Sequence, residues 1–175
     1  MSANPLSRPI KVETLPPEGL EVEVVATEEE RAALAAENDI PSIERLVAHL
    51  RLRPVAADGV AVDGRLTAAL TRVCVVTLEP FETTVDEPID LRFAPESHLP
   101  QPHPGEEVEI GASDPPDPYV NGKIDLGAVV AEFFVLGLDP YPRKPGAAFA
   151  LDAGAGDATS PFAALSRLKP ADKGE

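Results

Sequence analysis

The stretch from Gly59 to Phe93, GVAVDGRLTAALTRVCVVTLEPFETTVDEPIDLRF, decides the fold of this chain. Residues 60–76 have the small and β-branched content of a long strand, and Gly64 is the candidate position for a bulge. A Leu-Glu-Pro corner follows, and residues 81–93 form the next strand. Sequential strands joined by a short turn favour antiparallel pairing. We therefore predict that the two segments pair with each other.

Two strands and a helix are predicted before this stretch. Apolar and polar residues alternate in 9–16 and again in 20–26, which indicates two half-buried strands joined like a hairpin at a Pro-Pro-Glu-Gly turn. Thr27 followed by Glu30 has the spacing of a capping box. The strong helix formers that follow predict a short helix ending near Asn38.

The remaining segments predict a mixed strand, a helix and a loop. From Ser42, the sequence SIERLVAHLRLRP first shows helical spacing and then strand alternation, so we expect a helical turn that gives way to a strand. Asp125 can cap the run LGAVVAEFFVLGL, which predicts an amphipathic helix closed by Asp139 and Pro140. Residues 94–123 are rich in proline, glycine and acidic residues, and we expect a long, mobile acidic loop.

Together these elements predict an α+β domain with an antiparallel, barrel-like sheet, two main helices and a long acidic loop. We expect the domain to span residues 1–146, with the mobile acidic loop at 94–123. After Gly146 the chain is rich in alanine, glycine and serine, so residues 147–175 are predicted to be a mostly disordered tail.

The sequence also predicts where the protein works. A single cysteine cannot form an internal disulfide. No stretch approaches the roughly 18 apolar residues of a membrane span, and the N-terminal residues MSANPLSRPI lack the apolar core of a signal peptide. We therefore expect a cytoplasmic protein that does not contact a membrane.

The formal net charge of the 175 residues is −15, and most of it lies in one block. Residues 73–139 contain 14 acidic and two basic residues. A surface of this sign repels phosphate chains, so broad binding to nucleic acid is disfavoured. Arginines recur without an acidic excess in residues 31–72, and the candidates for RNA contact there are Arg51, Arg53, Arg65 and Arg72. The ordinary interpretation of these arginines is solvated charge on strand edges.

Groups for catalysis are scarce in this sequence. Cys74 is the only cysteine, and the three histidines are scattered along the chain away from it. There is no phosphate-binding glycine loop and no pair of cysteines. Glu106, Glu107 and Glu109 are more simply a solvated charge run than a metal site. We expect a non-enzymatic protein without cofactor or metal, with a metal-dependent hydrolase as the less favoured alternative.

The order of residues 62–93, an acidic loop and residues 122–146 resembles the bacterial large ribosomal RNA subunit accumulation proteins, the YceD family. The resemblance spans roughly Pro5 to Gly146. It is strongest at the corner and at the start of the last helix, in Cys74, Leu78, Glu79, Pro80, Asp125 and Leu126. The family usually has Cys-x-x-Cys-Leu-Glu at the corner, and here Thr77 replaces the second cysteine. A single thiolate cannot hold zinc, so Cys74 is expected to pack the corner.

The resemblance implies a role in the synthesis, processing or stability of large-subunit (23S) ribosomal RNA. Ribosomal and assembly proteins are often strongly basic, so an acidic block would steer them toward this chain. We favour an acidic adaptor for such a basic protein, with its binding residues in Glu106, Glu107, Glu109, Asp114 and Asp117. The alternative is direct contact with ribosomal RNA through the arginines of the strand face.

Overall fold

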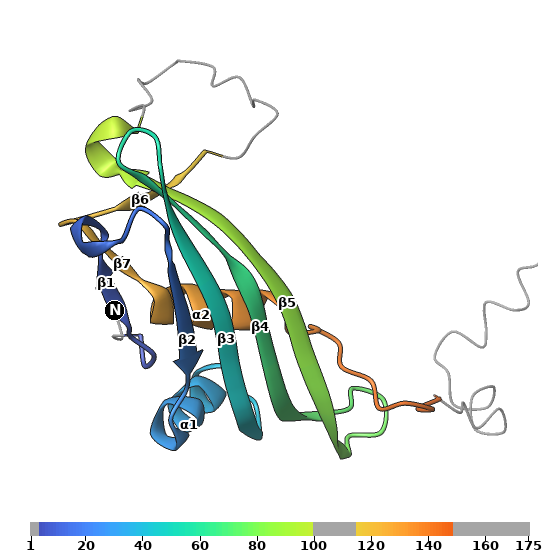
Figure 1. The fold of residues 1–175 in the computed structure, drawn as a ribbon. Helices are drawn as coiled ribbons and strands as arrows, with labels where there is room; N and C mark the ends of the chain where they lie inside the picture. The colour runs from blue at the N-terminus through green and yellow to red at the C-terminus, as the bar shows by residue number, and fades with distance from the viewer. Residues whose placement is uncertain (1–3, 100–114, 149–175) are drawn as a thin grey trace, which may run out of the picture.

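The computed structural model describes residues 4–99 and 115–148, which are centred on a five-stranded sheet (Figure 1). In order across the sheet, the strands are β2 (Leu20–Val25), β3 (Ser42–Val55), β4 (Gly59–Val73), β5 (Pro80–Pro95) and β6 (Asp117–Tyr119). Neighbouring strands are antiparallel, except that β5 and β6 are parallel. The α+β class and the mainly antiparallel pairing predicted from the sequence are confirmed.

The sheet is open and does not form a barrel. In the part of the chain that the structure describes, β2 and β6 each pair with one neighbour. β2 has six residues and β6 has three, and β6 contacts only one end of β5. Closing a barrel requires the two edges to pair along their length. The predicted barrel-like closure was therefore wrong, because these edge strands are too short to meet.

Two helices and a small second sheet accompany the central sheet in the described residues. The helices are α1 (Glu28–Glu37) and α2 (Leu126–Leu136), and both predicted helices are confirmed. α1 begins at the predicted capping box of Thr27 and Glu30, and α2 has Asp125 as its N-cap. The second sheet pairs β1 (Pro9–Lys11) with β7 (Lys123–Asp125), and short 3-10 helices span Val12–Thr14 and Glu96–His98.

The hydrophobic core lies between α2 and the sheet face that it covers, which we call the inner face (Figure 1). Leu126, Val130 and Phe134 of α2 are fully buried there. They pack with inward side chains of the strands, including Leu66 of β4 and Ile89 of β5. Burying one such side chain is worth about 1.5–3 kcal/mol, so this layer is the main source of stability. The opposite face of the sheet is called the outer face.

β4 and β5 pair as predicted, over the whole range from Val60 opposite Phe93 to Val73 opposite Pro80. Their register does not shift at Gly64, so the bulge predicted there was wrong. The glycine is present for another reason. A Cβ atom at this position would overlap the carbonyl oxygen of His49 on β3. Gly64 therefore allows the backbones of β3 and β4 to approach each other closely.

β3 is a single strand from Ser42 to Val55, so the predicted helical turn at its start was wrong. The strand has an irregularity in its pairing with β4 between Ile43 and Arg45. An extra residue at such a bulge interrupts the alternation of inward and outward side chains. Ile43, Leu46, Val47 and Leu50 are all buried, and Ile43 and Leu46 are three residues apart. That spacing is the one that suggested a helix.

The predicted N-terminal hairpin was also wrong. Both strands exist, but β1 pairs with β7 and β2 pairs with β3. Between β1 and β2 lie a 3-10 helix and the pair Pro16-Pro17. Because proline has no N–H to donate, a ladder cannot continue through these two residues. The chain therefore crosses from the small sheet to the central one.

The predicted acidic loop is shorter than residues 94–123. Ala94 and Pro95 end β5, a 3-10 helix follows, and β6 and the start of β7 lie at the other end of the range. Residues 100–114 lie outside the described part of the chain, as does the predicted tail from residue 149 onward. Within the described residues, no helix is long and apolar enough to cross a membrane.

Candidate functional site

The acidic residues predicted to bind a partner are only partly described. Glu106, Glu107, Glu109 and Asp114 lie outside the described residues. Asp117 is described and is exposed on β6, where it lies opposite Phe93 of β5.

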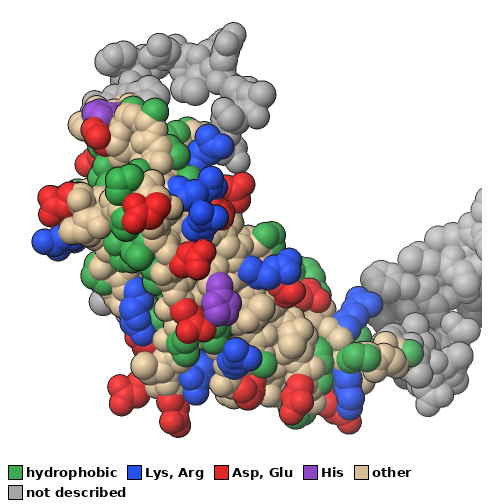
Figure 2. Space-filling view, viewed as in Figure 1, with side chains coloured by type: hydrophobic (Ala, Val, Ile, Leu, Met, Phe, Trp, Pro, Cys, Tyr) green, Lys and Arg blue, Asp and Glu red, His purple; other side chains and the backbone are tan. Residues whose placement is uncertain are grey.

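Three of the four predicted arginines lie together on the outer face of the sheet. Arg51 of β3 lies directly opposite Asp63 of β4, and His49 of β3 lies opposite Arg65 of β4. Because residues two apart on a strand point the same way, these four side chains share one face. Arg53 lies two residues from Arg51 and points the same way. Figure 2 shows this face, where basic and acidic side chains are interspersed.

Arg72 does not belong to this set, which corrects the sequence prediction. It is two residues from Leu70, which is buried on the inner face. Because alternate residues of a strand share a face, Arg72 lies on the inner side. Its guanidinium donates a hydrogen bond to the carbonyl oxygen of Asp139, at 3.1 Å. Arg72 thus holds the segment that follows α2.

Carboxylates pair with two of the arginines on the outer face. Arg53 contacts Asp63 at 2.6 Å, and Arg65 contacts Asp86 at 3.3 Å. Arg51 lies opposite Glu21 of β2 as well as Asp63 of β4. Exposed ion pairs of this kind contribute little to stability, but they reduce the potential that a phosphate chain would meet.

The corner between β4 and β5 is built around the buried Cys74. Its sulfur accepts hydrogen bonds from the N–H groups of Val76 and Thr77, at 3.4 and 3.5 Å. The corner is closed by bonds from the Cys74 N–H to the Glu79 carbonyl and from the Leu78 N–H to the Cys74 carbonyl, both at 2.9 Å. Leu78 has a φ of 59° and an exposed side chain, so it forms the tip of the corner.

The corner also holds the segment that follows α2. The Val75 N–H donates to the carbonyl oxygen of Pro142 at 2.9 Å, and Lys144 forms an ion pair with Glu79 at 2.9 Å. Cys74 and Thr77 supply one thiol and one hydroxyl, and no group of three or more histidine, cysteine or acidic side chains gathers within the described residues. This donor set does not fit a structural zinc site. The corner instead joins two distant segments.

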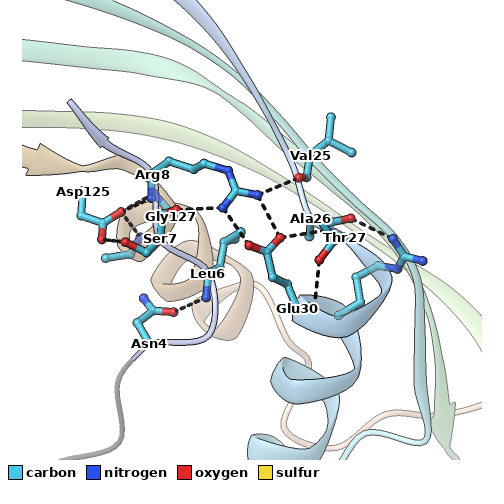
Figure 3. Close-up of polar contacts among 12 residues, drawn as sticks. Asn4, Leu6, Ser7, Arg8, Val25, Ala26, Thr27, Glu30, Asp125 and Gly127 are labelled. Atoms are coloured by element: carbon cyan, nitrogen blue, oxygen red, sulfur yellow. Dashed lines mark hydrogen bonds and ion pairs between the residues drawn. The ribbon is translucent and has the colours of Figure 1, made fainter.

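A second polar cluster joins the N-terminal segment to both helices (Figure 3). Asp125 accepts bonds from the N–H groups of Gly127 and Ala128, which caps α2. It also accepts bonds from the Ser7 hydroxyl at 2.7 Å and the Arg8 N–H at 2.6 Å. The cluster therefore fixes the start of α2 against the N-terminal segment.

Arg8 extends this cluster to α1. Its guanidinium binds both carboxylate oxygens of Glu30, at 2.7 and 2.9 Å. The bond from Arg8, opposed by burial and assisted by Thr27, lowers the pKa of Glu30 to about 2. The sequence predicted the caps Asp125 and Glu30 but gave no sign of Arg8, because its partners are distant in the chain.

A sequence model of the family described as large ribosomal RNA subunit accumulation protein YceD matches residues 62–169. The chain belongs to the YceD family. The match covers the β4–β5 corner and α2, and it extends past Gly146, where the resemblance noted from the sequence ends. No curated protein and no solved structure matches the chain.

The YceD motif residues of this chain hold the described fold together. At the corner, the backbone N–H of Cys74 donates a hydrogen bond to the carbonyl oxygen of Glu79, and the Glu79 carboxylate forms an ion pair with Lys144. At the start of α2, Asp125 binds the N-terminal segment and Leu126 is fully buried. Pro80 begins β5 opposite Val73. In this YceD protein these motif residues position segments that are far apart in sequence.

We predict that the Cys74 thiol titrates near pH 6. A hydrogen bond with the Thr77 side chain, together with backbone N–H groups, outweighs burial and lowers its pKa from 9.0 to about 6. Because this pKa is below that of the unfolded chain, the stability contributed by the thiolate is lost as the pH falls through 6. Thiolate absorbance at 240 nm measures the titration directly.

Thr77→Ala should raise the pH midpoint of this titration toward the ordinary pKa of a thiol. Urea unfolding of the unaltered protein should show stability rising between pH 6 and 9, and Cys74→Ser should lack that contribution. A titration midpoint near 9 in the unaltered protein would contradict the assignment of these hydrogen bonds.

Proposed function

We propose that this protein supports the accumulation of large-subunit (23S) ribosomal RNA as a non-enzymatic acidic adaptor in the cytoplasm. Its partner would be a basic ribosomal or ribosome-assembly protein. The observation that carries this proposal is the pairing of Arg53 and Arg65 with carboxylates on the outer face. With a formal net charge of −15, the chain is suited to attract a basic protein rather than a phosphate backbone.

The composition of the described surface supports a binding role over catalysis. Cys74 is the only thiol of the chain, and it lies buried in the corner beside Thr77 and Lys144; within the described residues it has no histidine beside it. A nucleophile needs access to substrate, and the Cys74 sulfur is fully buried. The exposed carboxylates of Glu82 and Asp90, by contrast, are available to a partner.

Direct contact with ribosomal RNA is the second candidate, because some arginines of the outer face are free. Arg51 and Arg92 are exposed, and neither forms an ion pair within the described residues. They lie on β3 and β5, on either side of β4. Such cations could contact phosphates, at an affinity that falls steeply with salt.

Charge reversal separates the two candidates. An acidic-set variant carries lysine at the five predicted acidic positions, and an arginine-set variant carries Arg51→Ala, Arg53→Ala and Arg65→Ala. Arg72→Ala is a single-site control for the loss of an arginine away from the outer face, since Arg72 lies on the inner face. Binding to purified basic ribosomal proteins and to 23S RNA fragments is measured across a salt series. The lysine substitutions in the acidic set are at Glu106, Glu107, Glu109, Asp114 and Asp117.

For an adaptor, the acidic-set variant should bind basic proteins about tenfold or more weakly and with a flatter salt dependence, because steering charges act together. The arginine-set variant should differ from the Arg72→Ala control by less than about threefold. Tight RNA binding at moderate salt that is lost in the arginine-set variant would instead establish direct RNA contact.

A further inference from the structure

β5 has a long edge without a partner in the described part of the chain. The strand has 16 residues and pairs with β4 along nearly all of them. On its other side, β6 pairs only with Phe93–Pro95, which leaves the 13 residues Pro80–Arg92 open. At about 3.3 Å per residue, this open edge is about 43 Å long. Figure 1 shows β5 at the border of the sheet.

The position of Pro88 indicates which backbone groups face the open edge. Pro88 lies inside the strand, opposite Arg65 of β4. A proline has no N–H and is tolerated in a sheet where the missing donor would point away from the neighbouring strand. Alternate residues of a strand direct their N–H and C=O groups to the same side. The N–H groups of Asp86 and Asp90 therefore point toward the open edge.

The open edge is acidic. The side chains of Glu82, Asp86 and Asp90 are exposed on the outer face, and Glu87 is half-buried on the inner face. Arg92 is the only basic residue of the open range. Among the four acidic residues, Asp86 has an ion pair within the described residues, with Arg65.

This charge determines what can pair with the edge. A second copy of the chain would bring its own carboxylates against Glu82, Asp86 and Asp90, and like charges on paired strands are destabilising. A strand with lysines or arginines at alternate positions would place them beside these carboxylates. Its backbone would extend the ladder on both sides of Pro88, which offers a carbonyl oxygen but no N–H to the open edge.

We propose that the open edge of β5, Pro80–Arg92, binds an extended lysine- or arginine-rich segment of the partner protein by strand addition. This inference rests on the adaptor function proposed above and gives it a site. Main-chain hydrogen bonds supply affinity, and the acidic side chains select a basic strand over an acidic or neutral one.

The test uses the full chain and a labelled 12-residue peptide of alternating lysine and threonine, with binding measured by fluorescence anisotropy. A second peptide has the same sequence but carries N-methyl groups on alternate backbone nitrogens, so it keeps its charge and loses ladder donors. A third has glutamate in place of lysine. Hydrogen exchange of the protein with and without the first peptide locates the site.

Two triple variants change the net charge by the same amount. One carries Glu82→Lys, Asp86→Lys and Asp90→Lys on β5. The matched control carries Glu18→Lys, Glu21→Lys and Glu23→Lys in and before β2, at the other border of the sheet. All six residues are exposed. Circular dichroism confirms that both variants fold.

We expect the β5 variant to bind the lysine peptide at least tenfold more weakly, and the β2 variant to lose less than threefold. N-methylation should weaken binding at least tenfold, and the glutamate peptide should not bind. The amides that face the open edge, those of Glu82, Thr84, Asp86, Asp90 and Arg92, should become protected. Equal losses in both variants, unchanged binding of the N-methylated peptide, or unprotected β5 amides would overturn the inference and leave the adaptor with another site.

Two other results have separate meanings. A dimer in light scattering whose edge-facing amides, those of Glu82, Thr84, Asp86, Asp90 and Arg92, are protected without peptide would assign the edge to a second copy and overturn the inference. If the unaltered chain binds neither the lysine peptide nor basic ribosomal proteins, the adaptor proposal itself fails.

Discussion

Gly64→Val should lower the free energy of unfolding by about 3 kcal/mol or more, because overpacking between two strands cannot relax easily. A Cβ at this position would overlap the His49 carbonyl oxygen and approach the Leu50 Cα to 3.0 Å. Both atoms belong to the backbone of β3, which is paired on its two sides. The variant must therefore move β3 away from β4 or lose part of the ladder. Urea unfolding measures the difference.

Thr67→Val is the matched control on the same strand. Thr67 is exposed on the outer face, and valine is as well suited to a strand as threonine, so its effect should stay within about 0.5 kcal/mol. If the free energy of unfolding of Gly64→Val lies within about 1 kcal/mol of that of the unaltered protein, the spacing of β3 and β4 is not set by this glycine.

Asp125→Ala should lower the free energy of unfolding by about 3 kcal/mol, from the loss of a helix cap and of two long-range hydrogen bonds. The carboxylate accepts four hydrogen bonds, from Ser7, Arg8, Gly127 and Ala128. Its removal leaves the start of α2 uncapped and frees the N-terminal segment. The free energy is measured by urea unfolding, and loosening of residues 6–11 is measured by hydrogen exchange.

Asp117→Ala is the matched control, because Asp117 is an exposed acidic residue and its change in net charge is the same.

Burial opposes the ionisation of Asp125, but its hydrogen bonds prevail and lower its pKa. The stability it contributes is thus present above the pKa of the unfolded chain and is lost on acidification. The difference between Asp125→Ala and the unaltered protein should shrink as the pH falls below about 4. If this difference in the free energy of unfolding does not change with pH, the ionised carboxylate of Asp125 is not the source of the stability.

The sequence determined the elements whose signals are local. The hairpin of β4 and β5 follows from two strand-forming runs joined by a short corner, and the starts of α1 and α2 follow from the capping residues Thr27 and Asp125. Each depends on residues within one turn or one hairpin. The motif that marks the YceD family also lies in these local elements.

The candidate site was predictable only in part, for the same reason. The sequence showed an acidic block and a group of arginines. The structure placed Arg51, Arg53 and Arg65 on one face and Arg72 on the other, because strand alternation and register decide which side chains are neighbours. The pairing of those arginines with Asp63 and Asp86 likewise depends on register across strands.

The tertiary structure alone decided which strands are neighbours and where an edge stays open. A bulge in β3 gave apolar residues a helical spacing in the sequence, and β1 paired with β7, more than a hundred residues away. Composition does not encode such pairings, because they depend on the summed packing and hydrogen bonding of distant segments. The open edge of β5 arises in the same way, since β6 is too short to cover it. Local chemistry fixed the elements, and long-range contacts fixed their arrangement.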